Sequence, residues 1–346
     1  LDSGDPSSGI NPIFSGIASG DYAFMLSGYT DGAGIVNFGQ DSSFAGNKVP
    51  QGYTDANGIG DFYYAPPAGY LALCTANLPE PAIGPNSAST SDEHFNTVLY
   101  TGTNSSLSVN VGFQPDFIWQ KRRDASGNNW NSDVLRGTNS ILATDLTNAE
   151  EATTMIESFD SNGFTVAGGN SGWNGSGTSH VAWNWKANGS GVSNTDGSIT
   201  STVSANVDAG FSIVTFTGTE TPGPHTIGHG LTQAPEVLIG KATAASESWV
   251  VYHHENTGAP ETDLLRLNNT NATTDLLQAW QDTAPTSSVF TVGSDGATNS
   301  TGGMVYYCFH GVEGFSKFGS YTGNGSTDGP FVYTGFRPAF VIIKNA

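Results

Sequence analysis

Pro115-Asp116-Phe117-Ile118-Trp119-Gln120-Lys121 is the stretch that decides the fold, because its pattern occurs three times in the chain. The other copies are Pro235-Glu236-Val237-Leu238-Ile239-Gly240-Lys241 and Pro338-Ala339-Phe340-Val341-Ile342-Ile343-Lys344. Proline is tolerated at the first position of a strand, and the short apolar run that follows it is typical of a strand buried on both faces. The pattern predicts three equivalent β-strands, each closed by a lysine that leaves the core and meets water.

Other landmarks repeat in the same order around these strands. An aromatic-Thr-Gly triplet precedes each of them, at residues 100–102, 216–218 and 321–323. Downstream, Phe164-Thr165-Val166 corresponds to Phe290-Thr291-Val292, and residues 181–186 correspond to residues 305–310. Ordered agreement of this kind indicates an internal tandem repeat, in which each copy is one structural unit.

The composition favours short strands joined by tight turns. Charged residues make up only 12 %, whereas the chain holds 45 Gly, 19 Phe, 12 Tyr and 7 Trp. Glycine supplies the positive φ angles that turns need, and aromatic residues are enriched in strands. We therefore predict an all-β protein of tandem, jelly-roll-like β-sandwich repeats, with a short helix or turn in each repeat.

The helix of the first repeat is expected just after residue 147. Thr147-Asn148-Ala149-Glu150 has the capping-box pattern, and apolar residues follow at helical spacing: Ala152, Met155, Ile156 and Phe159. Residues 273–280 are the corresponding candidate in the second repeat.

The landmarks predict four segments. Residues 1–90 form a partial β-sandwich segment, in which the Gly-rich turn at 31–34 runs into a strand near residues 35–40. Residues 91–192 and 193–315 are complete repeats, and residues 316–346 begin a third. Since two strands do not close a sandwich, we expect the chain to continue or to take strands from a neighbouring chain.

The net charge of −20 excludes several classes of partner. Nucleic acids and anionic membranes are polyanions, so neither is expected to hold this chain electrostatically. No apolar run is long enough for a membrane helix, and no signal peptide is visible. The two cysteines, Cys74 and Cys308, stand in apolar contexts and are predicted to be buried free thiols.

One loop resembles part of a calcium site. In residues 55–61, Asp55, Asn57 and Asp61 alternate around glycine, as oxygen ligands do in calcium loops, but the closing bidentate glutamate is missing. A β-turn explains the same residues, so these three side chains are weak metal candidates. No cofactor is predicted.

The search for catalytic groups yields no enzyme prediction. No Gly-x-Ser-x-Gly elbow is present. His253-His254-Glu255 is expected to be a solvated strand end. His225 and His229 are four residues apart and would share a face only on a helix, which the surrounding Gly and Pro residues make implausible. Lys121-Arg122-Arg123 is expected to be a salt-bridged strand end beside Asp124. Paired carboxylates of a glycan-degrading enzyme cannot be identified from sequence.

Three tryptophans are the candidate ligand contacts. Trp130, Trp173 and Trp249 lie in polar, turn-like surroundings. Aromatic rings in such places can stack on sugars, and each can equally belong to a core. They are weak glycan-stacking candidates.

Two resemblances bear on function. Residues 36–40, 65–70 and 77–79 resemble the C-terminal half of a SPRY-type, concanavalin-like β-sandwich found in marine phage proteins. Residues 95–346 resemble the repeated domains of tail-fibre-like and appendage proteins of marine bacteriophages, through the strings Ile227-Gly228-His229-Gly230-Leu231 and 313–326.

The second resemblance implies a non-enzymatic structural part of a virion, a tail fibre or appendage that contributes to host attachment. It implies other virion proteins as partners, a homo-oligomer for which a trimer is the guess by analogy, and contact with a host-surface glycan. The alternatives are a carbohydrate-binding adhesin module, a capsid decoration protein and a glycan-degrading enzyme.

Overall fold

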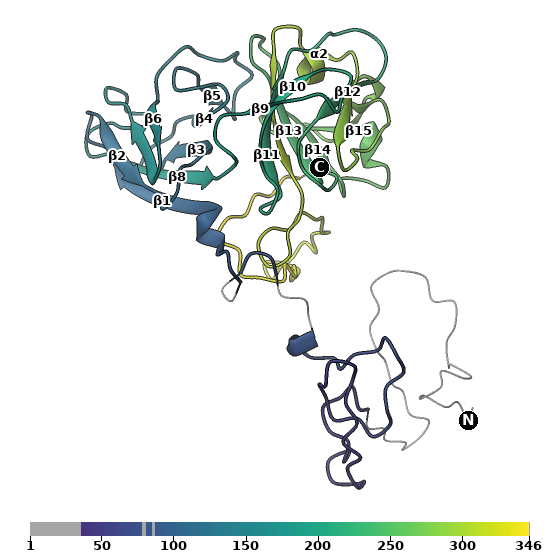
Figure 1. The fold of residues 1–346 in the computed structure, drawn as a ribbon. Coiled ribbons are helices and arrows are strands. Elements are labelled where there is room, and N and C mark those ends of the chain that lie inside the picture. The colour runs from purple at the N-terminus through teal and green to yellow at the C-terminus, as the bar shows by residue number, and fades with distance from the viewer. Residues whose placement is uncertain (1–35, 78–80, 85–86, 346) are drawn as a thin grey trace. The chain divides into compact units, whose positions relative to one another are not determined.

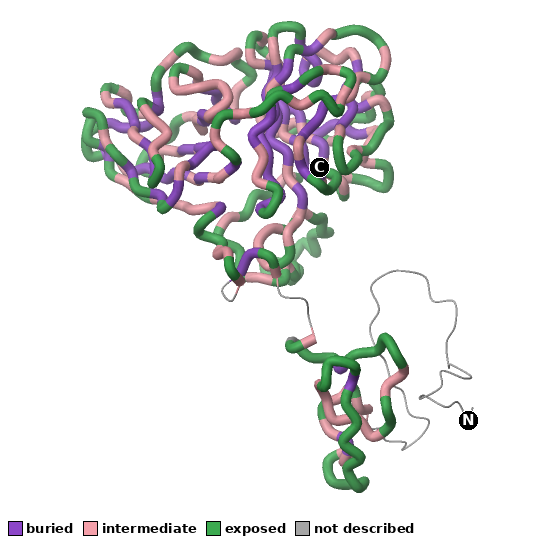
Figure 2. The backbone as a smooth tube through the Cα atoms, viewed as in Figure 1, coloured by how far each residue is buried: buried purple, intermediate pink, exposed green. Residues whose placement is uncertain are grey.

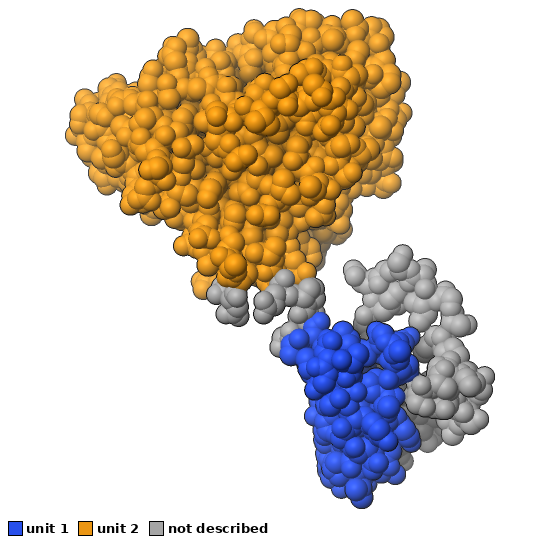
Figure 3. Space-filling model, viewed as in Figure 1, with its two compact units in different colours: residues 1–80 blue, residues 81–346 orange. Residues whose placement is uncertain are grey.

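The computed structural model describes residues 36–77, 81–84 and 87–345. The chain divides into two compact units, residues 1–80 and residues 81–346 (Figure 3). The described residues form 18 strands and only two short α-helices, so the all-β prediction is confirmed. Within these residues, no helix combines the length and the hydropathy that a membrane crossing requires.

The described part of the first unit holds no regular strand. Residues 36–77 contain one isolated bridge, between Tyr53 and Phe62, and the short 3-10 helix η1 (Thr75–Asn77). The strand expected at residues 36–40 is not formed, because Asn37 ties that segment into a turn. Its amide donates to the carbonyls of Asp41 and Asp61, and its oxygen accepts from Gly39 N. Such local side-chain bonds compete with a strand ladder; residues 31–35 lie outside the described part.

The first repeat is a sandwich of two antiparallel sheets (Figure 1). The larger has the order β1-β8-β3-β4-β5, and the smaller has the order β2-β7-β6. The strands are β1 (Phe95–Thr101), β2 (Leu107–Asn110), β3 (Phe117–Arg122), β4 (Asn129–Asp133), β5 (Leu142–Ala143), β6 (Ile156–Asp160), β7 (Gly163–Val166) and β8 (Ser179–Trp185).

The second repeat preserves this topology and extends it. Its large sheet has the order β16-β15-β14-β13-β18-β11-β10-β9, in which β11-β18-β13-β14-β15 matches the sheet of the first repeat; β12 pairs with β17 in the small sheet. The elements are β9 (Val192–Asn194), β10 (Ser201–Asn206), β11 (Phe211–Phe216), β12 (His225–Gly228), β13 (Val237–Ala242), β14 (Val250–His253), η3 (Pro260–Thr262), β15 (Asp263–Arg266), β16 (Thr274–Asp275), α1 (Leu277–Trp280), β17 (Val289–Val292), α2 (Gly296–Asn299) and β18 (Met304–Phe309). The shared strand order confirms the repeat.

Each repeat encloses its own core, and a third core joins the two repeats. Alternation along the central strands separates the cores, since successive side chains of a strand point to opposite faces. Ile118 of β3 lies in the core of the first repeat, whereas Phe117 lies in the joining core. Tyr306 of β18 lies in the core of the second repeat, whereas Tyr307 lies in the joining core. Figure 2 shows the buried residues concentrated along these strands.

The joining core packs the large sheets of both repeats against each other. The rings of Phe117 and Tyr307 stack at 4.0 Å between centroids, with 28° between their planes. Trp249 of the second repeat is fully buried, and its Nε1 donates to the Ala143 carbonyl of the first at 2.8 Å. Residues 91–315, predicted as two separate sandwiches, are therefore parts of one unit.

The helix predicted after residue 147 is wrong. Glu151 makes a bridge to Ile141, and Ile156 begins β6, which joins β7 through a two-residue turn at residues 161–162. Met155 and Ile156 are both buried in the core, so packing overrides the helical spacing. In the second repeat a short helix, α1, does form within the predicted range.

The third copy of the Pro-to-Lys pattern forms no strand. Val341, Ile342 and Ile343 are exposed, and no strand is assigned in the described residues after Phe309. Strands β3 and β13 each lie between two hydrogen-bonded neighbours. Residues 338–344 have no such neighbours in the part of the chain that the structure describes, so the pattern alone does not form a strand.

The lysine that closes the pattern does not simply meet water. Lys241 is fully buried, and its Nζ donates to the carbonyls of Ala242 at 2.7 Å and Ala245 at 3.0 Å. The corresponding Lys121 donates to the carbonyl of Gly127. In the second repeat the ammonium group is thus buried and bound to backbone oxygen, which corrects the prediction of a solvated end there, whereas Lys121 is only partly buried.

A buried asparagine explains the aromatic-Thr-Gly triplet in the first repeat. A Cβ on Gly102 would clash with the backbone at Asn174 and Gly175, so only glycine allows this close approach. Asn174 is fully buried, and its Oδ1 accepts from Thr103 N at 2.8 Å while its Nδ2 donates to the Ser105 carbonyl at 2.7 Å. The triplet therefore anchors the loop that follows β1.

The second repeat contains the same arrangement. Gly218 packs against the backbone of Asn299, which is also fully buried. Asn299 Oδ1 accepts from Thr219 N at 3.0 Å, and its Nδ2 donates to the Gly293 carbonyl at 2.6 Å. The two asparagines are thus equivalent anchors, each placed shortly before the strand (β8 or β18) that pairs with the triplet-bearing strand.

We predict that Asn299→Ala lowers the free energy of unfolding by about 2–4 kcal/mol, because it leaves buried backbone groups without partners. Chemical denaturation of the full chain measures this value. Asn148→Ala, at an exposed asparagine, is the matched control and should change it by less than about 0.5 kcal/mol. Equal effects of the two variants would contradict the anchoring role.

Candidate functional site

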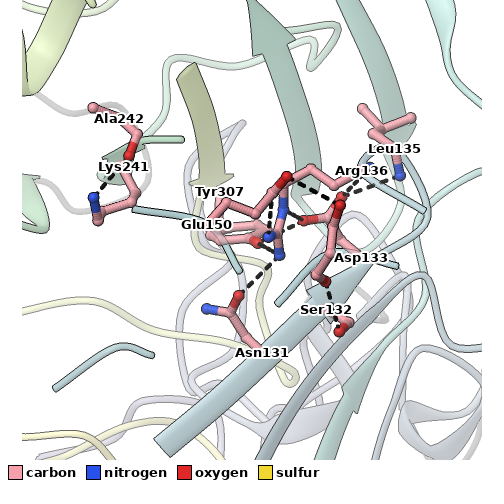
Figure 4. Close-up of polar contacts among 10 residues, drawn as sticks. Asn131, Ser132, Asp133, Leu135, Arg136, Glu150, Lys241, Ala242 and Tyr307 are labelled. Carbon is pink, nitrogen blue, oxygen red and sulfur yellow. Dashed lines mark hydrogen bonds and ion pairs between the residues drawn. The ribbon is translucent and has the colours of Figure 1, made fainter. Parts of the chain in front are cut away.

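The most densely bonded polar cluster surrounds Arg136, which follows β4 in a tight turn. Asp133 makes this turn, because its Oδ1 accepts from the backbone N of Leu135 and of Arg136, at 3.1 and 3.0 Å. An aspartate that binds the backbone two residues ahead is a common way to initiate a turn. The turn directs the guanidinium group back toward the second repeat (Figure 4).

The Arg136 guanidinium binds four side chains. Nε donates to Asp133 Oδ2 at 2.6 Å, Nη1 to Glu150 Oε2 at 2.9 Å, and Nη2 to Asn131 Oδ1 at 2.9 Å and Tyr307 Oη at 3.3 Å. The Tyr307 hydroxyl donates to Asp133 Oδ2 at 2.7 Å. Since Tyr307 is on β18, this network joins the two repeats at the edge of the aromatic joining core.

Burial governs the electrostatics of this network. The side chains of Arg136 and Asp133 are 4 % and 0 % exposed. Burial alone would lower the pKa of Arg136, but the neighbouring Asp133, Tyr307 and Glu150 raise it. Burial also raises the pKa of Tyr307 well above its ordinary value. Arg136 therefore stays charged, and Tyr307 stays a neutral hydrogen-bond donor.

The chemistry available here is structural. Both carboxylates are bound to one guanidinium group, and Glu150 Oε1 also accepts from Ser140 Oγ at 3.0 Å. A general acid or base must exchange a proton with a substrate. The carboxylate oxygens of Asp133 and Glu150 already accept hydrogen bonds from protein donors. The network is a polar staple between two sheets.

A groove of about 390 Å³ borders the staple. Leu135, Arg136 and Glu150 line it from the first repeat. The second repeat contributes a lining rich in hydroxyl groups: Thr200, Ser201, Thr202, Thr215, Phe216, Thr217, Thr243, Gly303 and Met304. This groove is the concave surface of the described chain in which hydroxyl, guanidinium and carboxylate groups come together.

None of the predicted site residues belongs to this cluster. A signal was present, because the chain has only 11 Lys and Arg, and Arg136 follows the apolar pair Val134-Leu135. A scarce basic residue in an apolar context indicates a buried ion pair. The sequence does not identify the partners of Arg136, because Tyr307 lies far from it along the chain.

The candidate calcium ligands form a turn. Asp55 is buried, and its carboxylate accepts from the backbone N of Asn57, Ile59 and Ala72 and from Asn77 Nδ2. Burial would raise its pKa, but these hydrogen bonds outweigh burial and lower it to about 2. The oxygens of Asp55 are thus occupied by protein donors, while Asp61 Oδ2 accepts from Ser42 N and Asn57 Nδ2 donates to Asn77 Oδ1.

The three tryptophans belong to cores. Trp173 and Trp249 are 4 % and 0 % exposed, and Trp130 packs edge-to-face on Trp173 with 5.9 Å between ring centroids. A buried ring cannot stack on a sugar at the surface, so Trp173 and Trp249 are not glycan platforms in this structure. Trp130 is only partly buried, and it packs against the core of the first repeat.

The histidines do not assemble a metal site. His225 begins β12, and His229, fully buried, accepts from Leu231 N and contacts the Thr286 carbonyl. Burial lowers the pKa of His229 and of His253. Within residues 36–77, 81–84 and 87–345, no three His, Cys, Asp or Glu side chains are placed to hold a metal ion.

Arg122 forms an ion pair with Asp124 at 2.6 Å at the end of β3, so the salt-bridged strand end is confirmed. Both cysteines are free. Cys308 is buried in the core of the second repeat, as predicted. Cys74 is exposed, which corrects the prediction of two buried thiols.

We predict that Arg136→Met lowers the free energy of unfolding by about 3–5 kcal/mol, because it leaves the buried Asp133 charge uncompensated. Chemical denaturation measures the loss. The double variant with Asp133→Asn should lose less than the sum of the single variants, since the two changes remove one interaction. Arg122→Met, which breaks an exposed pair, is the control and should cost about 0–1 kcal/mol. Additive losses would contradict the staple.

Lys241 gives a prediction for pH. Burial lowers its pKa from 10.5 to about 8, although Glu247 opposes this shift. Between these values the unfolded chain binds more protons than the folded chain, so the free energy of unfolding rises with pH. Relative to Lys241→Met, the wild-type chain should therefore gain stability between pH 7.5 and 9.5. Denaturation of both proteins at the two pH values tests this, and a constant difference would contradict the lowered pKa.

The comparisons with known proteins agree with the extent of this unit. One family model, described as a domain of unknown function (DUF7483), matches residues 90–346. That range holds all the strands described above and the Arg136 staple. The comparisons with curated proteins and with solved structures gave no match. The chain therefore belongs to the DUF7483 family.

Proposed function

We propose that this chain is a non-enzymatic structural component of a bacteriophage virion, a tail fibre or appendage that contributes to host attachment. The observation that carries the proposal is the joining core. Two sandwiches that share a stacked aromatic layer and a buried ion network cannot turn freely against each other. A rigid piece of this kind suits a part whose work is to hold other parts at a fixed position.

The electrostatics support the same role. A net charge of −20 keeps the chain soluble and does not favour binding to nucleic acid. Glu150, the carboxylate that lines the groove beside the staple, is engaged by Arg136, which leaves that groove without a free acid and base. The resemblance to marine phage appendage proteins supplies the virion context, with other virion proteins as partners and the extracellular particle as the location.

A carbohydrate-binding adhesin module is the second candidate. The groove beside the staple favours it, because the threonine and serine hydroxyls that line it can bind the hydroxyls of a host-surface glycan. Binding of free chain to a glycan array, abolished by Thr215→Val but not by Thr97→Val on β1, which does not line this groove, would favour this alternative.

We predict that mass spectrometry of density-purified phage particles finds peptides of this chain at a few to tens of copies per particle, as expected for a tail or fibre part. The major capsid protein provides the internal standard. Hundreds of copies would instead indicate a capsid decoration protein. If the chain were absent from particles and found free or on cells, the virion proposal would fail.

A further inference from the structure

The two repeats differ at one side of the sandwich. In the second repeat, β10 covers the edge of β11 and is itself covered by β9. The residues between β9 and β10 close the gap to the other sheet, since Ile199 bridges Ile227 of β12. That side of the second sandwich is therefore closed by the segment that precedes β11.

The same side of the first repeat is open within the described residues. Strand β1, the equivalent of β11, ends its sheet, and the residues before it form the 3-10 helix η2 (Ser91–Glu93) instead of a covering strand. A groove of about 400 Å³ lies between β1 and β2. Leu99, in the middle of β1, is 61 % exposed. Figure 1 shows β1 at the outer margin of its sheet.

The backbone groups on this edge can be assigned. Lys186 N donates to the His94 carbonyl, and Gly102 N donates to the Thr178 carbonyl. Hydrogen-bonded residues alternate along an antiparallel strand, so the even-numbered residues of β1 bond to β8. The N–H and C=O groups of Phe95, Thr97, Leu99 and Thr101 consequently point away from the sheet.

The edge lacks the features by which natural sheets prevent pairing. Strand β1 reads Phe-Asn-Thr-Val-Leu-Tyr-Thr, without charge, proline or bulge, and pairs with β8 in unbroken register over seven residues. An exposed, uncharged and regular edge is a template for another strand. The net charge of −20 lies elsewhere on the chain.

We propose that β1 pairs antiparallel with β1 of a second copy of this chain, around a two-fold axis at Val98. In this register Thr97 faces Leu99 of the other copy and Phe95 faces its Thr101, so the outward-pointing backbone groups of both strands bond to each other. The side chains of each strand stay on their own face, because the facing positions are all odd-numbered. Strand β1 is thus self-complementary, as a two-fold interface requires.

The occupant is a copy of the same chain because its strand satisfies the edge in every position. The interface is independent of the virion proposal and predicts a dimer, whatever larger particle holds it. Both chains are acidic, so salt that screens their repulsion should strengthen the pairing. A basic partner strand would show the opposite dependence on salt.

Sedimentation velocity of the full chain, at micromolar concentrations and at two salt concentrations, tests this proposal. We expect a species of twice the 36.0 kDa chain mass, with a lower Kd at higher salt. Thr97→Pro removes an N–H that only the second copy uses, and Leu99→Lys adds a charge to the edge. Each should raise the Kd about tenfold or more. Val192→Lys, at an exposed position of the edge strand β9, should leave it unchanged.

Hydrogen exchange of the Thr97 and Leu99 amides gives the second measurement. Their protection should increase with protein concentration and disappear in Thr97→Pro, while the denaturation midpoint of that variant's monomer stays near that of the wild type. A monomer or trimer, or protection that does not depend on concentration, would overturn the proposal. The last result would mean that the chain covers its own edge.

Discussion

The stack of Phe117 on Tyr307 is the contact on which the larger unit depends. It belongs to two central strands whose side chains alternate between two cores, so each strand contributes to a sandwich and to the layer between sandwiches. Aromatic pairs at this separation add stabilisation beyond their buried area. A strand of this kind has no face left for water, which explains why every residue of β18 is apolar and why β3 and β13 each begin with three apolar residues.

Four polar side chains inside this layered structure bind groups on other segments of the chain. Asn174 and Asn299 bind loop backbone, Lys241 binds two carbonyls, and Arg136 binds acceptors from both repeats. A buried ion pair contributes little net stability compared with apolar residues of similar size. Its directional bonds nevertheless require one relative position of the two sheets, whereas an apolar layer tolerates small displacements.

Much of the fold was predictable because it depends on local patterns. The Pro-led runs at 115 and 235 become β3 and β13, and the aromatic runs near 181 and 305 become β8 and β18. The absence of a helix after residue 147 was not predictable, since burial of Met155 and Ile156 decides that segment. The strand at 338–344 failed for a related reason: a strand needs neighbours, and pattern alone does not supply them.

The candidate site was predictable only in part. Trp249 and Tyr307 form the joining layer with residues more than a hundred positions away, and no local pattern encodes such pairs. Asp55 was recognised as an oxygen donor in a turn, but its occupation by four protein donors requires the positions of Ala72 and Asn77. Surroundings, not residue type, decide whether a tryptophan or a carboxylate is available to a ligand.

The face-to-face packing limits how further repeats can be added to this architecture. The two repeats meet through equivalent faces, the outer sides of β1-β8-β3-β4-β5 and β11-β18-β13-β14-β15. In a solenoid each repeat offers one surface to the repeat before it and another to the repeat after it, so the series can extend indefinitely. Here the matching surface of each repeat is buried against the other repeat. The two repeats of this chain therefore form a closed pair, and a further copy of the sandwich would have to be attached through a surface of a different kind.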